Sequence, residues 1–418
     1  MEKLVIEGGI PLKGNVEIIG AKNSAVALLP ATLLINGIAT INNLPNISDI
    51  KISCEILEGL GSKIKWNNSH SVTIDNRNIK NTTAPIDLTS KFRASYYLIG
   101  AMLGRLGKIE VGLPGGCNLG PRPIDQHIKG FEALGASIDL SQGKIMVQAN
   151  KLEGTTIYLD IVSVGATINI MLAAVLSNGT TFIENAAKEP HVVDIANFLN
   201  SMGANIKGAG TDIIRIKGVK KLHGTNYSVI PDQIEAGTYM VLATITRGDI
   251  TIKNIIPKHL ESISAKLSDV GNQVIIYDEA IRVIGSDTIL PTSIKTMPYP
   301  GFPTDMQPQF SCALALANGV SKIEESIFEN RFKYVDEIVK MGADIKIDKS
   351  TLIINGVSEL KCKNVIAPDL RAGAALVLAC LATKGKSEID KIEFVERGYE
   401  DFVNKLKDLG ADIKKIEE

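Results

Sequence analysis

The sequence has few aromatic residues, little net charge and no long apolar segment. Aromatic side chains make up 5% of the chain, which argues against a surface that stacks nucleic-acid bases. The formal net charge of −1 provides no overall field that attracts nucleic acid or an anionic membrane. The longest apolar runs are far shorter than the roughly 20 residues of a membrane span. We therefore expect no nucleic-acid or membrane partner, and we expect these runs to be buried helices.

Cysteine is also scarce, and its spacing excludes two kinds of site. The five cysteines are Cys54, Cys117, Cys312, Cys362 and Cys380, with no C-x-x-C pair among them. An odd number at wide spacing predicts reduced thiols and a cytoplasmic location rather than a disulfide framework or a zinc site. The N-terminus also has no apolar stretch of signal-peptide length.

Motifs for bound cofactors are missing as well. The five histidines are scattered without metal-ligand spacing. No G-x-G-x-x-G opens a helix, and the GKS at Gly385 lacks the upstream glycine of a phosphate loop. We expect no metal and no cofactor, so anions would be bound by side chains and helix ends.

A repeat is the main positive feature of the sequence. A pattern of an apolar residue, then Gly, then a short strand recurs about every 70 residues, with the glycine at Gly61, Gly135, Gly203, Gly271, Gly342 and Gly410. Each glycine follows an amphipathic helical stretch and is placed to cap it. Each unit also contains an almost wholly apolar helix. Six such units could form a ring, a solenoid or two domains of three, and domain size favours the last.

Charged residues recur near equivalent points of these units. Lys22, Arg93, Asp305 and Arg371 lie at the starts of apolar helices, and Ser163 opens another. Arg122, His191, Arg331 and Arg397 lie where the amphipathic helices begin. A cation at a helix N-terminus is unfavourable unless an anion binds there too. Single surface arginines are usually solvated, but their recurrence predicts a cleft for a small polyanion.

The segment PGGCNLGPRP, residues 114–123, is unlike any other part of the chain. Its glycines and prolines predict a loop. Cys117 lies in it near Arg122, a setting that lowers a thiol pKa and leaves the sulfur accessible. The thiol could be a nucleophile or a general acid, or only a small apolar side chain packed beneath the loop. We favour a functional thiol here and structural roles for the other four cysteines.

Seven ordered motifs resemble the UDP-N-acetylglucosamine 1-carboxyvinyltransferase family over essentially the whole chain. They are GAKNSAVALLPA, PGGCNLGPRPID, SVGATINIMLAA, FPTDMQPQF, FENRF, DLRAGAALVLA and ERGYE. The resemblance implies an α/β fold of two inside-out α/β barrels, each with three βαβαββ units. It places one domain at residues 21–229, with the cysteine loop at about 112–123, and the other at residues 1–20 plus 230–418.

The resemblance also implies an activity. The enzyme would be a transferase of the 2.5.1 class that moves the enolpyruvyl group of phosphoenolpyruvate to the 3-hydroxyl of UDP-N-acetylglucosamine. Phosphate would leave by addition and then elimination, in the first committed step of peptidoglycan synthesis. Fosfomycin would alkylate the loop thiol. Cys117 would be a proton donor or form a covalent adduct, and the sequence leaves this choice open.

Site residues follow from the same motifs. The catalytic set would be Cys117, Asp305, Lys22 and Arg397, with Asp305 taking the 3-hydroxyl proton. Phosphoenolpyruvate would contact Lys22, Asn23, Arg122, Arg331, Arg371 and Arg397. The sugar nucleotide would contact Asn23, Arg93, Arg122, Pro123, Ile124, Asp125, Gln126, Ser163, Val164, Gly165, Asp305 and Ile327. Some family members carry lysine at the position of Ile161, so the resemblance implies no charged diphosphate contact at this position.

Two other functions remain open from the sequence. The sister family, 5-enolpyruvylshikimate-3-phosphate synthase, shares the repeats and phosphoenolpyruvate but lacks the PGGC loop. A catalytically silent paralogue could bind sugar nucleotides and regulate, although Cys117, Asp305, Lys22 and Arg397 are all present. The sequence gives no oligomeric state.

Overall fold

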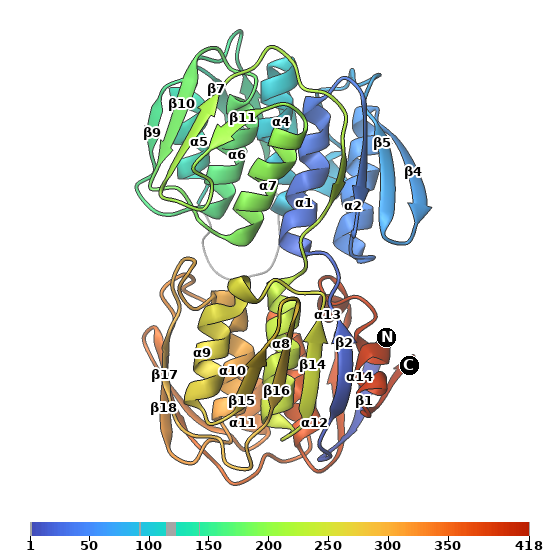
Figure 1. Ribbon diagram of the computed structural model, residues 1–418, viewed down its shortest axis with the longest axis vertical. Coiled ribbons are helices and arrows are strands. Elements are labelled where there is room, and N and C mark those ends of the chain that lie inside the picture. The colour runs from blue at the N-terminus through green and yellow to red at the C-terminus, as the bar shows by residue number, and fades with distance from the viewer. Residues whose placement is uncertain (1, 92, 114–122, 142, 418) are drawn as a thin grey trace. The chain divides into compact units, whose positions relative to one another are not determined.

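A computed structural model describes residues 2–91, 93–113, 123–141 and 143–417. Cys117 and Arg122, both predicted site residues, lie outside these ranges. The described residues form two compact units, one of residues 20–230 and one of residues 2–19 with 231–417 (Figure 1). The predicted domain ranges stay a prediction. These two units are defined by which residues pack together, and that does not show that either unit folds by itself. No helix in the described part of the chain is long and apolar enough to cross a membrane.

Six helices form the interiors of the two units. In the 20–230 unit they are α1 (Lys22–Ala31), α4 (Tyr97–Leu106) and α6 (Val164–Ala174). In the other unit they are α8 (Gln233–Ile245), α10 (Gln307–Leu314) and α12 (Leu370–Ala382). Within each unit the three helices contact one another or a shared helix neighbour, in one apolar cluster per unit. Because these segments are apolar on nearly every face, burial on all sides is their stable arrangement.

Six amphipathic helices cover these interiors. They are α2 (Ser48–Leu60), α5 (Asp125–Ala133), α7 (Pro190–Ser201), α9 (Glu261–Asp269), α11 (Val335–Lys340) and α14 (Phe402–Asp408). The repeat glycine follows each helix by one or two residues, at φ between 93° and 108°. A side chain rarely adopts this left-handed conformation. A strand begins two residues after each glycine, so the repeat in the sequence marks one structural unit six times.

Small sheets complete the units in the described ranges. The 20–230 unit has sheets β13-β3-β5-β4, β6-β8-β7 and β9-β10-β12-β11, and the other has β2-β14-β16-β15, β17-β18-β20-β19 and β21-β22-β1-β23. Their strands are β1 (Glu2–Gly8), β2 (Lys13–Glu17), β3 (Ile38–Asn42), β4 (Lys63–Asn68), β5 (Ser71–Asp75), β6 (Lys108–Gly112), β7 (Ser137–Asp139), β8 (Lys144–Gln148), β9 (Thr156–Tyr158), β10 (Thr180–Glu184), β11 (Asn205–Lys207), β12 (Ile213–Lys217), β13 (Asn226–Ser228), β14 (Asp249–Lys253), β15 (Gln273–Ile276), β16 (Ala280–Ile284), β17 (Ser293–Lys295), β18 (Val320–Glu324), β19 (Asp344–Asp348), β20 (Thr351–Asn355), β21 (Asn364–Ile366), β22 (Gly385–Asp390) and β23 (Asp412–Glu417).

The chain's first strands belong with its C-terminal half. β1 lies between β22 and β23 and is antiparallel to both, so it completes the sixth unit. β2 precedes α1 but pairs in parallel with β14, whereas β13 precedes α8 and pairs in parallel with β3. The short strand before each of these two helices thus pairs in the sheet of the other unit: β2 precedes α1 but belongs to the sheet of β14, and β13 precedes α8 but belongs to the sheet of β3. Figure 1 shows β2, in blue, beside β14.

Candidate active site

Asp305, whose side chain is 25% exposed, lies between two buried arginines in the unit of residues 231–417. It is in the 3-10 turn η4 (Thr304–Met306), immediately before α10. Arg331 donates from Nη2 to its Oδ1 at 3.0 Å, and Arg371 donates from Nε to its Oδ2 at 3.2 Å. Both arginine residues are only 3% exposed. Three predicted site residues are therefore in direct contact here.

The two guanidinium groups set the protonation state of Asp305. Burial alone would raise the pKa of this carboxyl, but the charges and hydrogen bonds of Arg371 and Arg331 outweigh it. They hold the pKa of Asp305 well below its usual range. Asp305 is thus ionised, as a proton acceptor must be, but it is a weak base while both arginines are attached.

Each of these arginines keeps one buried donor unused. Arg331 Nε and Arg371 Nη1 have no hydrogen-bond partner among the described residues. A buried N–H group without an acceptor is costly, and more so on a charged group. The cluster therefore has donor capacity for an anion beyond the one carboxylate that it holds.

Neighbouring residues fix the position of Arg371. Asp369 caps α12 by accepting hydrogen bonds from the backbone N–H groups of Arg371 and Ala372, each at 3.0 Å. The Arg371 guanidinium lies over the Tyr399 ring, 5.4 Å from its centroid. Gly398 packs so closely on Leu370 that an added Cβ would lie 2.7 Å from that side chain. The half-buried Arg397, predicted to bind phosphoenolpyruvate, is thereby held near the start of α12.

Lys22 and Asn23 begin α1 in the unit of residues 20–230. Lys22 Nζ lies 2.8 Å from Oδ2 of Asp49, in α2, and both side chains are largely buried. Ser24, the next residue along α1, donates its hydroxyl hydrogen bond to the buried Asp194. Lys22 is therefore positioned on a fixed helix end by a buried carboxylate, which offsets the unfavourable interaction of a cation with a helix N-terminus.

The two predicted sugar-nucleotide segments of this unit lie side by side. Gln126 accepts a hydrogen bond from the backbone N–H of Asp160 at 2.9 Å and donates to its carboxylate at 3.2 Å. Ser163 caps α6 through Ala166 N–H, at 3.3 Å. A Cβ on Gly165 would lie 3.0 Å from Nε2 of His127. The start of α5 and the start of α6 therefore form one surface of residues 123–127 and 160–165.

His127 packs on the interior side of this surface. Its Nδ1 accepts a hydrogen bond from Asn169 at 2.9 Å. Burial, and then the positive charge of Arg93, lower the pKa of His127 to about 4, so the ring is neutral at pH 7. Arg93 itself lies over the Tyr96 ring, 5.3 Å from its centroid. The predicted contact Arg93 is thus on the same side of the unit as α5.

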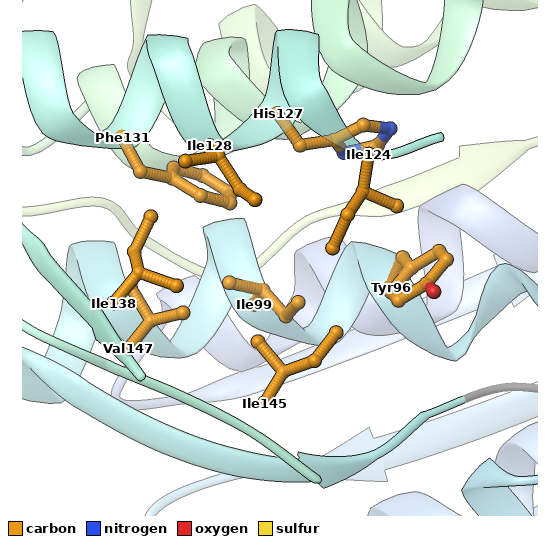
Figure 2. Close-up of a pocket in the computed structure, with 9 residues that line it drawn as sticks. All are labelled: Tyr96, Ile99, Ile124, His127, Ile128, Phe131, Ile138, Ile145 and Val147. Atoms are coloured by element: carbon orange, nitrogen blue, oxygen red, sulfur yellow. The ribbon is translucent and has the colours of Figure 1, made fainter. Parts of the chain in front are cut away.

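An apolar cavity of about 10 Å³ lies between α4, α5 and β8. Figure 2 shows Ile124 and His127 beside Tyr96 at one end and Phe131 with Ile138 and Val147 at the other. The volume is at the lower limit for one water molecule, and the lining is nearly all apolar. The cavity is therefore part of the packing beneath the start of α5 and not a substrate pocket.

The other predicted residues are distributed as follows. Pro123, Ile124 and Asp125 lead into or begin α5, and Val164 begins α6. Ile327 is 37% exposed in the loop after β18. Ile161, which lies where some relatives have lysine, is 58% exposed on the α5–α6 surface. The single cleft predicted to unite the residues of both units stays a prediction.

Sequence reasoning missed several residues that hold these groups in place. They are Asp49, Asp369, Glu325, Phe328 and Tyr399. The two aspartates that cap α8 and α12, Asp232 and Asp369, follow proline in the matching segments PDQIEAG and PDLRAG, so the repeat contains a signal for them. Asp49 and Glu325 are in ordinary helix and strand-end positions, and nothing local in the sequence marks them.

Comparison with known proteins identifies the family. The profile of the family described as EPSP synthase (3-phosphoshikimate 1-carboxyvinyltransferase) matches residues 6–406. UDP-N-acetylglucosamine 1-carboxyvinyltransferase 2 of Clostridium acetobutylicum is 57% identical over 416 residues, covering 99% of each chain. The enzyme named UDP-N-acetylglucosamine 1-carboxyvinyltransferase in Clostridium botulinum is 57% identical over 417 residues, 100% of each. The chain belongs to the UDP-N-acetylglucosamine 1-carboxyvinyltransferase family. The resemblance seen in the motifs is confirmed.

Solved structures confirm the fold of this family member. The enolpyruvyl transferase NikO from Streptomyces tendae matches with a TM-score of 0.89 at 26% identity, over 99% of this chain and 98% of that one. EPSP synthase from Acinetobacter baumannii matches with a TM-score of 0.77 at 19% identity over the full length of both. The second likeness shows the fold alone. The predicted α/β enolpyruvyl transferase fold, with three repeats around each interior, is therefore confirmed.

Proposed function

We propose that this protein transfers the enolpyruvyl group of phosphoenolpyruvate to the 3-hydroxyl of UDP-N-acetylglucosamine and so begins peptidoglycan synthesis. One structural observation carries the proposal: an ionised, half-buried Asp305 lies between two buried arginines that each retain an unused donor. This supplies a proton acceptor and an anion site at adjacent positions. The full-length relatives, which bear the name of this activity, support the choice of acceptor.

The reaction adds the sugar across the double bond and then eliminates phosphate. A proton is added to the CH2 carbon of phosphoenolpyruvate, and the positive character that develops at C2 draws attack by the 3-hydroxyl. Asp305 takes the hydroxyl proton. The tetrahedral intermediate then loses a proton from its methyl group, the double bond forms again, and phosphate leaves. The net change balances without a further reactant, because the sugar hydroxyl proton ends on the released phosphate.

Phosphoenolpyruvate carries a carboxylate and a phosphate, and the proposed cations match that charge. Arg331 Nε and Arg371 Nη1 are donors available to one anionic group. We assign Lys22, Asn23, Arg122 and Arg397 to the same substrate, with Lys22 aligned by Asp49. Buried, fixed cations stabilise charge that develops on the departing phosphate without reorganising during the reaction.

Substrate binding would also activate the base. When an anion binds Arg331 and Arg371, its negative charge offsets part of their electrostatic attraction for the Asp305 carboxylate. The pKa of Asp305, which these arginines hold low, then moves upward and the carboxylate becomes a stronger proton acceptor. A general base works best when its pKa approaches the operating pH.

The sugar nucleotide would bind along the α5–α6 surface. The assigned contacts are Asn23, Arg93, Arg122, Pro123, Ile124, Asp125, Gln126, Ser163, Val164, Gly165, Asp305 and Ile327. The start of α6 offers backbone N–H groups to a diphosphate. Ile161 contributes no charge, so the diphosphate would depend on Arg122 and the helix end at this point. The predicted cytoplasmic location fits the reduced cysteines and remains a prediction.

Cys117 completes the proposal from the sequence alone. As the loop thiol it would donate the proton to carbon or form an adduct with phosphoenolpyruvate. Treatment with fosfomycin followed by peptide mass mapping tests its accessibility. We expect the adduct on Cys117, because Cys54, Cys312 and Cys380 are buried and the half-buried Cys362 donates a hydrogen bond from Sγ to the Lys384 carbonyl. A main adduct on another cysteine would contradict the assignment.

The proposed reaction itself is tested by product analysis. The protein is incubated with phosphoenolpyruvate and UDP-N-acetylglucosamine, and the sugar nucleotide is examined by NMR. We expect two new vinyl protons and the loss of the free 3-hydroxyl. Recovery of unchanged sugar nucleotide from a preparation shown to be folded would contradict the proposal.

A further inference from the structure

Glu325 is a buried acidic residue whose hydrogen-bond donors in the described part of the chain are all neutral. It directly follows β18 and is 4% exposed. Oε1 accepts hydrogen bonds from Thr296 Oγ1 at 2.9 Å, from Ile327 N–H at 2.8 Å and from Phe328 N–H at 3.2 Å. Oε2 accepts from the Thr304 hydroxyl at 2.9 Å. Four donors thus converge on the two oxygens of this side chain.

The two oxygens reach two different segments of the candidate site. Thr304, held by Oε2, is the residue immediately before Asp305. Ile327 and Phe328, held by Oε1, begin the loop that leads to Arg331. The Phe328 ring lies beneath the Arg331 guanidinium, 5.5 Å from Cζ to the centroid. Glu325 therefore anchors the backbone on both sides of the contact between Asp305 and Arg331.

We propose that Glu325 is a positioning residue for the transfer reaction, which sets the base Asp305 and the anion-binding Arg331 relative to each other through Thr304 and Phe328. The inference rests on the roles proposed above for Asp305 and Arg331. Among the described residues, the hydrogen bonds of Glu325 go to Thr296, Thr304, Ile327 and Phe328 and not to these two side chains, so it acts through the segments that carry them. Catalytic groups on turns and loops need such support, because a displacement of about 1 Å can cost on the order of a hundredfold in rate.

The contacts of Oε2 and those of Oε1 can be tested with separate variants. Thr304→Val removes the hydroxyl that binds Oε2 and keeps the side-chain shape. We expect kcat to fall about tenfold with little change in KM for phosphoenolpyruvate, since the base is displaced and the arginines are not. Phe328→Leu removes the ring beneath Arg331. We expect it to raise KM for phosphoenolpyruvate severalfold with a smaller effect on kcat.

The carboxylate itself is tested with a disruptive and a conservative variant. Glu325→Ala removes the hydrogen bonds of both oxygens, and we expect kcat to fall about a hundredfold while KM for phosphoenolpyruvate rises. Glu325→Gln should recover most of the activity. Its amide oxygen accepts the three donors of Oε1, and its NH2 group donates to Thr304, whose hydroxyl is also an acceptor.

Thr383→Val is the matched control for loss of a buried hydroxyl. Thr383 is in the same unit, beyond the far end of α12 from Arg371, and its hydroxyl donates to the Ala379 carbonyl at 2.7 Å. Urea unfolding of both threonine variants measures their stability. The inference requires that Thr304→Val loses activity and that Thr383→Val, at a similar unfolding free energy, keeps it.

The outcomes separate this inference from the proposed function. If Asp305→Asn is inactive but Thr304→Val and Glu325→Ala match the wild-type kcat, Glu325 does not position the site and the inference is wrong. If Asp305→Asn is fully active, the role of Asp305 itself is wrong. If Glu325→Ala cannot be purified folded, the comparison of Thr304→Val with Thr383→Val decides.

Discussion

Arg371 donates from Nε to Oδ2 of Asp305 at 3.2 Å, so a proposed anion-binding residue and the proposed base share one hydrogen bond in the structure. Arg331 occupies the other carboxylate oxygen. A substrate anion that binds the unused donors, Arg331 Nε and Arg371 Nη1, would share these arginines with Asp305. We therefore expect binding of phosphoenolpyruvate and activation of the proposed base to be coupled within this cluster.

This coupling predicts different pH profiles for two kinetic constants. Asp305 must be ionised to accept a proton, so activity falls as pH falls through its pKa. In the free enzyme Arg371 and Arg331 hold that pKa well below the usual range. With phosphoenolpyruvate bound it rises. We expect the acid limb of kcat, which reports the substrate complex, to lie at higher pH than that of kcat/KM. An acid limb at the same pH in both profiles would contradict the coupling.

The pairing of Lys22 with Asp49 predicts two graded effects on phosphoenolpyruvate. Lys22→Met removes a fixed cation, and we expect kcat/KM to fall by roughly a hundredfold to a thousandfold. Asp49→Asn leaves Lys22 in place but removes its 2.8 Å ion pair, which should raise KM severalfold. Steady-state kinetics measures both effects.

Lys144→Met is the control for these two variants. It breaks the more exposed Lys144–Glu110 pair in the same unit, and it should leave phosphoenolpyruvate kinetics unchanged. Wild-type KM and kcat in Lys22→Met would argue against the assigned role of Lys22.

Gly165 predicts a specific effect on the sugar nucleotide. In Gly165→Ala the new methyl group would lie 3.0 Å from Nε2 of His127, so the ring or the start of α6 must shift. We expect KM for UDP-N-acetylglucosamine to rise about tenfold, since helix-end N–H groups bind phosphate only when correctly placed. Gly37→Ala is the control, because its methyl group meets no atom closer than 3.8 Å. Equal sugar-nucleotide KM values for the two variants would refute the proposed contact.

A buried acid predicts the pH dependence of stability. Burial raises the pKa of Glu235 to about 7 from 4.5, although Lys405, 2.7 Å away, lowers it. The folded chain therefore retains this proton up to about pH 7, whereas the unfolded chain releases it near pH 4.5. The resulting stability is fully present below pH 4.5 and is lost as pH rises to 7. The change is on the order of 3 kcal/mol.

Urea unfolding between pH 5 and 8 measures this dependence. Compared with the wild type, Glu235→Gln should show a weaker decline in unfolding free energy across this range, because its amide does not titrate. Parallel curves for the two proteins would show that Glu235 keeps an ordinary pKa.

The repeating parts of the fold could be predicted because they obey local rules. Gly61 and its five equivalents adopt the left-handed conformation that their position after an amphipathic helix predicts. The buried helices were evident from apolar residues on every face. The exchange of β2 and β13 between sheets could not be read locally, because strand pairing depends on residues more than a hundred positions away.

The candidate site divides in the same way. Asp305, Arg331 and Arg371 were found because charge is unusual at the start of an apolar helix or in a short motif. Their mutual contacts depend on how β18 and α12 pack and were not evident from spacing. Glu325 was missed because a glutamate after a strand is usually solvent-exposed, and only the structure shows its four donors.

The central claim is that this family member uses UDP-N-acetylglucosamine as the acceptor. Phosphate release from phosphoenolpyruvate, measured with that sugar nucleotide and separately with shikimate 3-phosphate, tests it most directly. We predict rapid release with the sugar nucleotide, its loss in Asp305→Asn, and no release above background with shikimate 3-phosphate. Release with shikimate 3-phosphate and none with UDP-N-acetylglucosamine would contradict the account.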